Sequence, residues 1–366
     1  MKAWLLPLAL MIAGCASAPV SNLAPRAAPA SLASAAPAWL AQQHVASVSI
    51  AMIENGEIAW TAAYGEQSPG VLATPRTLYN VASLAKPISA EVMLRLASAG
   101  RVSLDEPMSR HWVDPDIADD PRRDVLTLRV ALSHRTGFAN WRRMSDGKLS
   151  FQSEPGLGFT YSGEGYEYAR RYTQAASGEA FEHASQRLVF DPLGMRDTAY
   201  TRRDWFEGRI ALPYGEDNVS GEADINTDEM LASDDLYTTT SDYARFVIAV
   251  MNNEGVSAEI AAQRLSYDVD LREGGCGGEN GMPMDVCPLG VGMGLGWMVL
   301  RYEGETVITH SGSDWGEQSL AFFVPERRIG MVIFTNSAHG KRLFPEIVAQ
   351  VYPNEDYLAL LRLQAR

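Results

Sequence analysis

The sequence predicts an α+β fold in which one antiparallel sheet, flanked by helices, is joined to a mainly helical second lobe. Two observations predict it. Segments with the patterns of β-strands occur towards both ends of the chain, whereas the middle, residues 82–260, has mainly helical spacing. The length of 366 residues also exceeds that of a single domain of ~150 residues. We therefore expect two packed lobes with a cleft between them.

Composition and charge exclude several classes of protein. The chain is 46% hydrophobic and 21% charged, which is typical of globular proteins. Its formal net charge of −14 leaves no basic stripe to neutralise phosphates, so no nucleic-acid partner is expected. No apolar run reaches the ~20 residues of a membrane span, which excludes a multi-pass membrane protein.

The first residues have the pattern of an export signal. Lys2 precedes an apolar run from Ala3 to Ile12 that is too short to span a bilayer. The run ends in Gly14-Cys15, which resembles the bacterial lipoprotein box, where the cysteine is lipidated and becomes the first residue. We therefore expect a lipoprotein signal peptide over residues 1–14. The alternative is an ordinary signal peptide that is cut near Ala16 or Ala18.

The residue after Cys15 bears on the compartment. Ala16 stands where Asp would favour retention in the inner membrane, so the resemblance implies a Gram-negative outer-membrane lipoprotein that faces the periplasm. Cleavage as an ordinary signal peptide would instead give a protein secreted to the periplasm. Residues 15–37 are rich in Ala, Ser and Pro, and we expect a flexible tether there, followed by one catalytic or binding domain over 38–366.

The elements of the domain follow from local patterns. Asn55-Gly56 between two apolar segments, Val45–Ile53 and Glu57–Tyr64, is a strong hairpin signal. Ser241–Asn253 shows helical spacing and ends near Gly255. Further strands and a last helix are expected over Gly296–Tyr302, Glu305–His310, Gln318–Val324, Ile329–Asn336 and Arg342–Val351. Cys276 and Cys287 lie in a Gly-rich segment without a nearby His, so in an oxidising compartment we expect a disulfide and no zinc site.

The segment 82–100 carries the pattern that most directly indicates chemistry. At 100° per residue, Glu91, Arg95 and Ser98 share one face, which we expect to face water, and Lys86 lies about 150° away on the apolar face. A buried lysine is costly unless it is paired or neutral, and a neutral amine can accept the proton of a serine nucleophile. Ser83 precedes Lys86 by three residues, so the hydroxyl and the amine can meet.

The position of Pro87 supports this interpretation. Proline fits near the start of a helix, which places Ser83 at the N-terminal end, where the helix dipole favours negative charge on an attacked carbonyl. The alternative is a helix-capping serine with a lysine that reaches the surface, because the S-x-x-K spacing is frequent by chance.

Further segments occur in a characteristic order. They are Tyr79-Asn80-Val81-Ala82 before Ser83-Leu84-Ala85-Lys86, Leu126 to Gly137, Pro155-Gly156 to Phe159-Thr160-Tyr161-Ser162-Gly163, Pro192-Leu193-Gly194-Met195, and His310-Ser311-Gly312. Over roughly residues 40–350 the chain thereby resembles the penicillin-recognising serine hydrolases, which include class C β-lactamases, DD-peptidases, esterases and D-aminopeptidases. The resemblance implies their β-lactamase/transpeptidase-like fold, with the active site in the cleft between the sheet and the helical lobe.

The resemblance also implies roles for individual residues. Ser83 would be the acylated nucleophile, and Lys86 and Tyr161 would share its proton and later protonate the leaving group. The backbone N–H groups of Ser83 and Ser313 would form the oxyanion hole. His310 and Gly312, on a strand that lines the cleft, would contact or orient the substrate. The alternatives are a core aromatic for Tyr161, with Tyr166 and Tyr168 close by, and a structural role for His310.

Two departures from the family pattern affect the expected substrate. Gly163 stands where the family has an asparagine whose amide commonly contacts the substrate, and His310 stands where many members have a lysine. A neutral imidazole carries no charge for a substrate carboxylate. Both departures favour a related esterase or peptidase over a dedicated β-lactamase.

The sequence therefore predicts a lipid-anchored serine hydrolase that forms an acyl-enzyme on Ser83. It would cleave an amide, ester or β-lactam bond in a small molecule or peptide of the cell envelope. The alternative is a non-catalytic envelope binding protein with the same fold. The six His residues show no metal-binding spacing, and neither a metal nor a cofactor is expected. The sequence does not indicate an oligomeric state.

Overall fold

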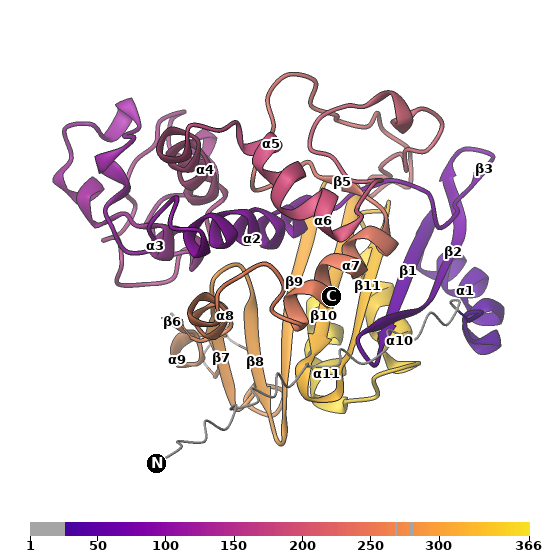
Figure 1. Ribbon diagram of the computed structural model, residues 1–366. Coiled ribbons are helices and arrows are strands. Elements are labelled where there is room, and N and C mark those ends of the chain that lie inside the picture. Colours follow the sequence, from indigo (N-terminus) through magenta and orange to yellow (C-terminus); the bar gives the residue numbers. More distant parts are fainter. Residues whose placement is uncertain (1–25, 268, 278–281) are drawn as a thin grey trace, which may run out of the picture.

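The computed structural model describes residues 26–267, 269–277 and 282–366 (Figure 1). The predicted signal peptide, Cys15 and the first part of the predicted tether lie outside these ranges. Nothing in the described part of the chain forms a helix that is both long and apolar enough to cross a membrane.

A nine-stranded antiparallel sheet forms the centre of the described residues, in the order β3-β2-β1-β11-β10-β9-β8-β7-β6. Its strands are β1 (Ser47–Glu54), β2 (Glu57–Ser68), β3 (Val71–Leu72), β6 (Val269–Asp270), β7 (Gly290–Met293), β8 (Met298–Tyr302), β9 (Glu305–Asp314), β10 (Glu317–Val324) and β11 (Ile329–Thr335). β1 pairs with β11 from Val48 opposite Thr335 to Ile53 opposite Gly330. Segments from both ends of the chain therefore meet in the sheet, as predicted.

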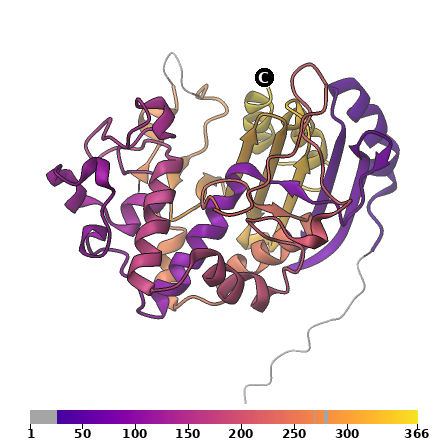
Figure 2. The same ribbon diagram turned by 90° about the horizontal axis from the view of Figure 1, so that it is seen from above.

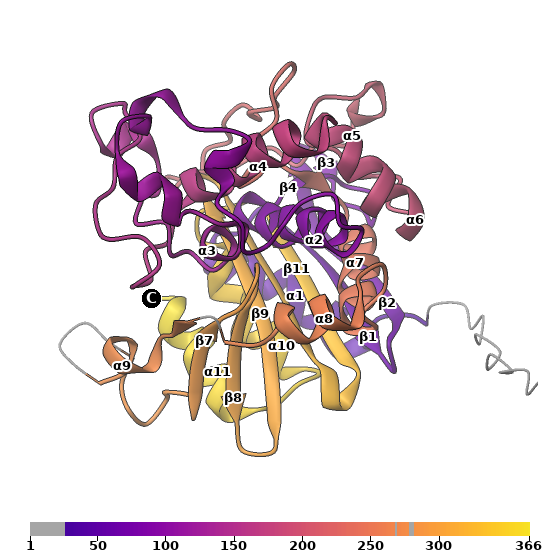
Figure 3. The ribbon, with the colours of Figure 1, turned by 60° about the vertical axis from the view of Figure 1, so that its left-hand side comes forward.

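Helices cover both faces of the sheet and build a second lobe at one side of it (Figures 2 and 3). One face carries α1 (Ala30–Gln43), α10 (Phe344–Ala349) and α11 (Glu355–Gln364), and the other carries α7 (Thr240–Met251) and α8 (Ala258–Arg264). The second lobe contains α2 (Ala85–Ser98), α3 (Leu128–Leu132), α4 (Gly163–Ser177), α5 (Phe181–Ser185) and α6 (Asp191–Leu193). The short α9 (Arg272–Gly275) contacts β7, and a small separate sheet pairs β4 (Tyr79–Asn80) with β5 (Tyr237–Thr238).

The sheet divides the interior into two apolar cores, because successive side chains of a strand point to opposite faces. In β1, Ile50 and Met52 belong to the core under α1, α10 and α11, whereas Ala51 and Ile53 belong to the core of α7 and the helical lobe. Both faces of β1 are therefore buried, which explains its nearly continuous apolar sequence.

The predicted hairpin and the C-terminal strands are confirmed. Asn55 and Gly56 have φ angles of 54° and 77°, the left-handed conformation that a two-residue hairpin turn requires, with Glu54 opposite Glu57. The helix predicted over Ser241–Asn253 is α7, whose N-terminus is capped because the Thr239 side chain accepts a hydrogen bond from the Asp242 N–H.

The prediction of a tether up to residue 37 is wrong at its end, because α1 begins at Ala30. Leu32, Ala36 and Leu40 are buried and follow one another at intervals of four residues, so they form one face of a helix that packs on the sheet. Other elements, among them α11, β6 and β7, are not predicted from the sequence. The prediction for the middle of the chain is only partly right, since residues 201–236 contain a single 3₁₀ turn (Asp204–Phe206) and otherwise irregular backbone.

The predicted exposed face of α2 is also wrong. Glu91 and Arg95 are buried, and Glu91 accepts hydrogen bonds from Arg95 Nε at 3.1 Å and from Arg264 Nη1 at 2.7 Å. Arg264 comes from α8 and is itself fully buried. Glu91 and Arg95 have the spacing of an exposed helical face, but here they form buried ion pairs, in which the Glu91 carboxylate is shared by Arg95 and Arg264.

Candidate active site

Ser83 and Lys86 lie at the junction between a short turn and α2. Ser83 belongs to a 3₁₀ turn, Ala82–Leu84, and Lys86 to the first turn of α2, where its side chain is fully buried. Lys86 Nζ donates hydrogen bonds to Ser83 Oγ at 2.9 Å and to the carbonyl oxygen of Ser233 at 2.8 Å. The spacing of three residues therefore brings the amine onto the hydroxyl.

The turn that holds Ser83 has an unusual backbone conformation. Ala82 has a φ of 47°, a left-handed conformation that is unfavourable for alanine. The Asn80 side chain accepts a hydrogen bond from the Ala82 N–H at 2.9 Å, and the Val81 carbonyl accepts one from Ser319 Oγ at 2.7 Å. These contacts fix the turn from β4, through Asn80, and from β10, through Ser319.

Tyr161 lies next to the lysine. Lys86 Nζ is 4.9 Å from the centroid of the Tyr161 ring, and Tyr161 is partly exposed to solvent. The two neighbouring tyrosines are bound elsewhere: the hydroxyl of Tyr166 donates to the Leu132 carbonyl at 3.1 Å, and that of Tyr168 to the Trp112 carbonyl at 3.4 Å. Of these three tyrosines, Tyr161 is the one that lines the cavity described below.

His134 holds the segment around Tyr161. Its carbonyl accepts the Thr160 N–H at 2.8 Å, and its Nδ1 accepts the Ser162 N–H at 3.1 Å. An Nδ1 that accepts leaves the proton of the neutral ring on Nε2, which is buried without a partner in the described part of the chain. Burial and the nearby charge of Lys86 hold the pKa of His134 well below its ordinary value. Sequence analysis places His134 in a family segment but assigns it no function.

Strand β9 forms the opposite wall with His310, Gly312 and Ser313. His310 Nδ1 lies 2.8 Å from the Ser311 carbonyl oxygen, to which it donates. Burial, and secondarily the charge of Lys86, lower the pKa of His310 to about 3, so this ring is neutral at physiological pH. A Cβ at Gly312 would lie 2.2 Å from the Val81 carbonyl oxygen and 3.0 Å from Ser83 N. Glycine is therefore required for β9 to approach the Ser83 turn this closely.

These residues surround one cavity of about 300 Å³, which Ser83, Tyr161, His310 and Ser313 all line. The structure thus brings together residues from three distant segments that sequence analysis singled out. A larger cavity of about 620 Å³ lies between α1 and β2 and contains none of them.

Asn140 is a cavity residue that sequence analysis missed. Its Oδ1 accepts the Gly163 N–H at 2.8 Å, and its carbonyl accepts the Glu164 N–H at 3.0 Å, so it binds the start of α4. A Cβ at Gly163 would lie 3.0 Å from the ring of Trp141, which occupies the space that a side chain would need.

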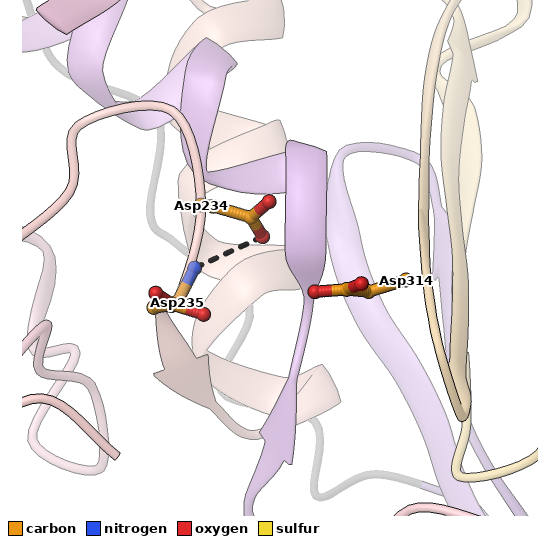
Figure 4. Close-up of side chains that lie close together, drawn as sticks. All are labelled: Asp234, Asp235 and Asp314. Atoms are coloured by element: carbon orange, nitrogen blue, oxygen red, sulfur yellow. Dashed lines mark hydrogen bonds between the residues drawn. The ribbon is translucent and has the colours of Figure 1, made fainter. Parts of the chain in front are cut away.

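Three carboxylates gather beside the site, where the loop before β5 meets the end of β9 (Figure 4). One oxygen from each of Asp234, Asp235 and Asp314 lies within 4.8 Å of the others. Asp234 follows Ser233, the carbonyl partner of Lys86, and Asp314 follows Ser313. Burial raises the pKa of Asp234 to about 7 and that of Asp235 to about 6. The sequence gives no sign of this cluster, because only the fold brings the segments together.

The cysteine prediction is confirmed as well. Cys276 and Cys287 form a disulfide with a Cα–Cα distance of 6.0 Å, within the usual range. It closes a loop between α9 and β7, the strand that supplies Met293 to the cavity.

Comparisons with known proteins agree with this geometry. The chain is 29% identical over 204 residues to esterase EstB of Burkholderia gladioli, a match that covers 46% of this chain and 50% of EstB. It is 25% identical over 307 residues to the D-alanyl-D-alanine-carboxypeptidase/endopeptidase AmpH of Escherichia coli, which covers 75% of each chain. The fold matches that of the octameric penicillin-binding protein homologue from Pyrococcus abyssi with a TM-score of 0.71, at 20% identity and over 84% of this chain and 73% of that one. A family model named Beta-lactamase matches residues 30–350, and the chain therefore belongs to the β-lactamase family.

Proposed function

We propose that this protein is a serine hydrolase that forms an acyl-enzyme on Ser83 and cleaves an ester, amide or β-lactam bond. The observation that carries the proposal is the 2.9 Å hydrogen bond between Nζ of Lys86, which is fully buried, and Oγ of Ser83, which lines the cavity. The second hydrogen-bond partner of Lys86 is a backbone carbonyl, so neither of these two partners is a carboxylate. This arrangement suits an amine that takes up the serine proton during attack.

The reaction then follows from the positions of the groups. Ser83 Oγ attacks the substrate carbonyl carbon while its proton moves to Lys86 Nζ. The backbone N–H groups of Ser83 and Ser313 stabilise the negative charge on the carbonyl oxygen, and the close approach at Gly312 is what brings these two segments together. Tyr161, beside Lys86, passes the proton to the leaving group. Water attacks the acyl-enzyme in the second half of the reaction and regenerates Ser83.

The expected substrates are small molecules or peptides of the cell envelope. The relatives EstB and AmpH are named for ester and D-alanyl peptide hydrolysis, respectively. The lipoprotein pattern at Gly14-Cys15 supports a location on the periplasmic face of a Gram-negative outer membrane, with Cys15 as the proposed lipid anchor. If so, a Cys15→Ser variant is expected to move from the membrane fraction to the soluble periplasmic fraction.

The test is covalent labelling of the protein without its predicted signal peptide and Cys15, residues 16–366, with a fluorophosphonate probe and with benzylpenicillin, read by intact-mass spectrometry; this protein keeps the whole of α1. Labelling that is lost in Ser83→Ala and kept in Ser98→Ala, a serine at the other end of α2, supports the nucleophile. Folded protein that takes up neither reagent and hydrolyses no ester would contradict the proposal. Adduct with the fluorophosphonate but not with penicillin would keep the hydrolase function and exclude β-lactams as substrates.

A further inference from the structure

We propose that the cavity beside Ser83 is an uncharged subsite that takes up an apolar group of the substrate and disfavours a carboxylate there. This inference rests on the proposed hydrolase function and specifies its substrate class.

The floor of the cavity is apolar. It is lined by side chains from β7, β8, β10 and α11: Met293, Met298, Leu300, Leu320, Tyr357 and Leu360. Phe159 and Tyr161 close the side that faces the helical lobe. The described residues that line the cavity include no Asp, Glu, Lys or Arg side chain. A substrate group that enters this space therefore exchanges water for hydrocarbon and aromatic surface.

The cavity lies at a step in the sheet. β8 pairs with β9 only as far as Met298 opposite Thr309, whereas β9 continues to Asp314. The cavity is lined by Met298, the first residue of β8, and by β9 residues from Thr309 onwards. It therefore extends into the space beside β9 that β8 does not reach. Leu360 of α11 closes it from the side of the C-terminal helix. The subsite is thus continuous with Ser83, and one end of a bound molecule can reach the nucleophile while the other lies in it.

The polar side chains in the lining match a neutral substrate because they are uncharged; they include Asn140, Thr309, His310, Ser311, Ser313 and Gln364. His310 donates through Nδ1 to the Ser311 carbonyl, so Nε2 offers a lone pair and no positive charge. Asn140 uses Oδ1 to accept the Gly163 N–H, which assigns Nδ2 as the donor side of its amide. The acceptor at His310 and the donor at Asn140 suit an ester or amide, whereas a carboxylate would find no cation among the described lining residues.

The surroundings of the cavity strengthen this discrimination. Asp314 follows Ser313 directly and lies with Asp234 and Asp235 at the end of β9 (Figure 4). A negative charge on Asp314, next to the lining residue Ser313, disfavours a second anion in the cavity, and burial of an unpaired carboxylate is itself costly. Each methylene that enters the cavity is expected to raise kcat/KM about fourfold.

The first test compares substrates that differ only in charge. Hydrolysis of p-nitrophenyl hexanoate is compared with that of the mono-p-nitrophenyl ester of adipic acid, which has a carboxylate at the end of the same six-carbon chain. We expect a preference of about a hundredfold or more for the hexanoate. We also expect the His310→Lys variant to show a smaller preference for the hexanoate, because the lysine would supply a cation for the carboxylate of the adipate ester. Equal rates for the two esters in the unmodified enzyme would overturn the proposal.

The second test varies chain length on both sides of the ester. One series extends the acyl group from acetate to octanoate with p-nitrophenol as the leaving group, and the other extends the alcohol of alkyl acetates. In the series whose variable group enters the cavity, kcat/KM should increase with each methylene. In the other series, kcat/KM should not depend on chain length. If neither series responds, the cavity does not hold the substrate.

Variants of α11 test whether the dependence of kcat/KM on chain length comes from this cavity. Leu360→Ala enlarges the cavity and should make a longer chain the best substrate, whereas Leu360→Phe fills it and should make a shorter chain the best substrate. Leu361→Ala removes the same atoms from the next residue, which is buried but does not line the cavity. If Leu361→Ala shifts the chain-length profile as Leu360→Ala does, the effect is one of stability and the proposal fails.

A binding experiment separates this inference from the proposed function. Ser83→Ala protein is titrated with N-alkylacetamides in a calorimeter, with no turnover required. If affinity rises about fourfold per methylene and is lost in the Leu360→Phe background, the subsite stands even if the protein hydrolyses nothing. If hydrolysis depends on Ser83 but neither turnover nor binding depends on chain length, the subsite is refuted and the hydrolase function stands.

Discussion

The imidazole of His134 lies nearly parallel to the phenol ring of Tyr161, with 4.3 Å between the ring centroids and 27° between the planes. The same residue accepts the N–H groups of Thr160 and Ser162, which flank Tyr161. Tyr161 is thus held through its ring and through the backbone on both sides. We therefore expect His134 to act as a positioning residue for Tyr161, the side chain that passes the proton in the proposed reaction.

Two substitutions of His134 separate these contacts. Asparagine tolerates the φ of 56° and keeps an acceptor for the Ser162 N–H but removes the stacked ring, whereas phenylalanine keeps a ring and removes the acceptor. We expect both variants to lower kcat by about ten- to a hundredfold, with little change in KM, because a displacement of about 1 Å has such an effect on catalysis.

The measurement is kcat, KM and the pH profile per active site, with active sites titrated by the fluorophosphonate probe. A merely structural role would reduce the number of active sites and leave the rate per site unchanged. His111→Asn is the control, because His111 packs against Tyr172, which does not line the cavity.

Lys86→Arg tests the amine as the proton acceptor. Arginine stays protonated at accessible pH and has no lone pair with which to accept the serine proton, so we expect kcat/KM to fall by about a thousandfold, in the range for a lost general base. Lys148→Arg makes the same change at an exposed position and should leave activity unaltered. A Lys86→Arg enzyme that retains a tenth of the activity would show that the lysine acts through its charge alone.

The buried ion pairs of Glu91 are expected to govern stability. Glu91→Gln leaves Arg95 and Arg264 charged in the interior without their common partner, which should lower the free energy of unfolding by about 3–5 kcal/mol. Glu106→Gln removes an exposed ion pair with Arg110 and should cost no more than about 1 kcal/mol. Urea unfolding of the two variants measures the difference. Equal effects would mean that the interior pairs contribute no more than a surface pair.

The free energy of unfolding should fall as the pH rises from about 6.5 to 8 and level off above that range. Burial raises the pKa of Asp234 to about 7 and that of Glu317 to about 8, so the folded state holds protons that the unfolded chain has already lost. His134 and His310, whose folded pKa values are lowered, act in the opposite direction, but only near and below the unfolded histidine pKa of about 6.5.

The measurement is urea unfolding at several pH values across this range. The double variant Asp234→Asn/Glu317→Gln should flatten the dependence on pH, and the exposed Glu106→Gln should not. A free energy of unfolding that rises with pH over this range in the unmodified protein would contradict the assignment.

Features encoded by neighbouring residues are those that the sequence predicts correctly. The Asn55-Gly56 turn, the strands after residue 296 and the contact between Ser83 and Lys86 each depend on a few adjacent positions. The residues of the cleft, by contrast, are assembled from distant segments. The order of the motif segments along the chain identified Tyr161 and His310 as site residues through a family resemblance. No local pattern marks Asn140 or the cluster of Asp234, Asp235 and Asp314.

The errors have the same origin. Glu91 and Arg95 have the spacing of an exposed helical face, and only the packing of α8, with Arg264, turns that face inwards. Strand β7 contains two glycines in four residues, a poor strand sequence that is stabilised by its pairing with β8. In α1, the alanines and the internal Pro37 conceal the three apolar residues that dock on the sheet.

The pairing of β1 with β11 dictates the order in which the molecule can be completed. Val48 pairs with Thr335, so a growing chain cannot complete the sheet until residues as far as β11 have left the ribosome. Before then the β1–β2 hairpin has an unpaired edge, and long-range pairing of this kind is slow. A nascent chain that completes its sheet so late remains accessible to chaperones that bind unfolded chains. That property would suit the export predicted from its first residues, because translocation through a narrow channel requires an unfolded chain.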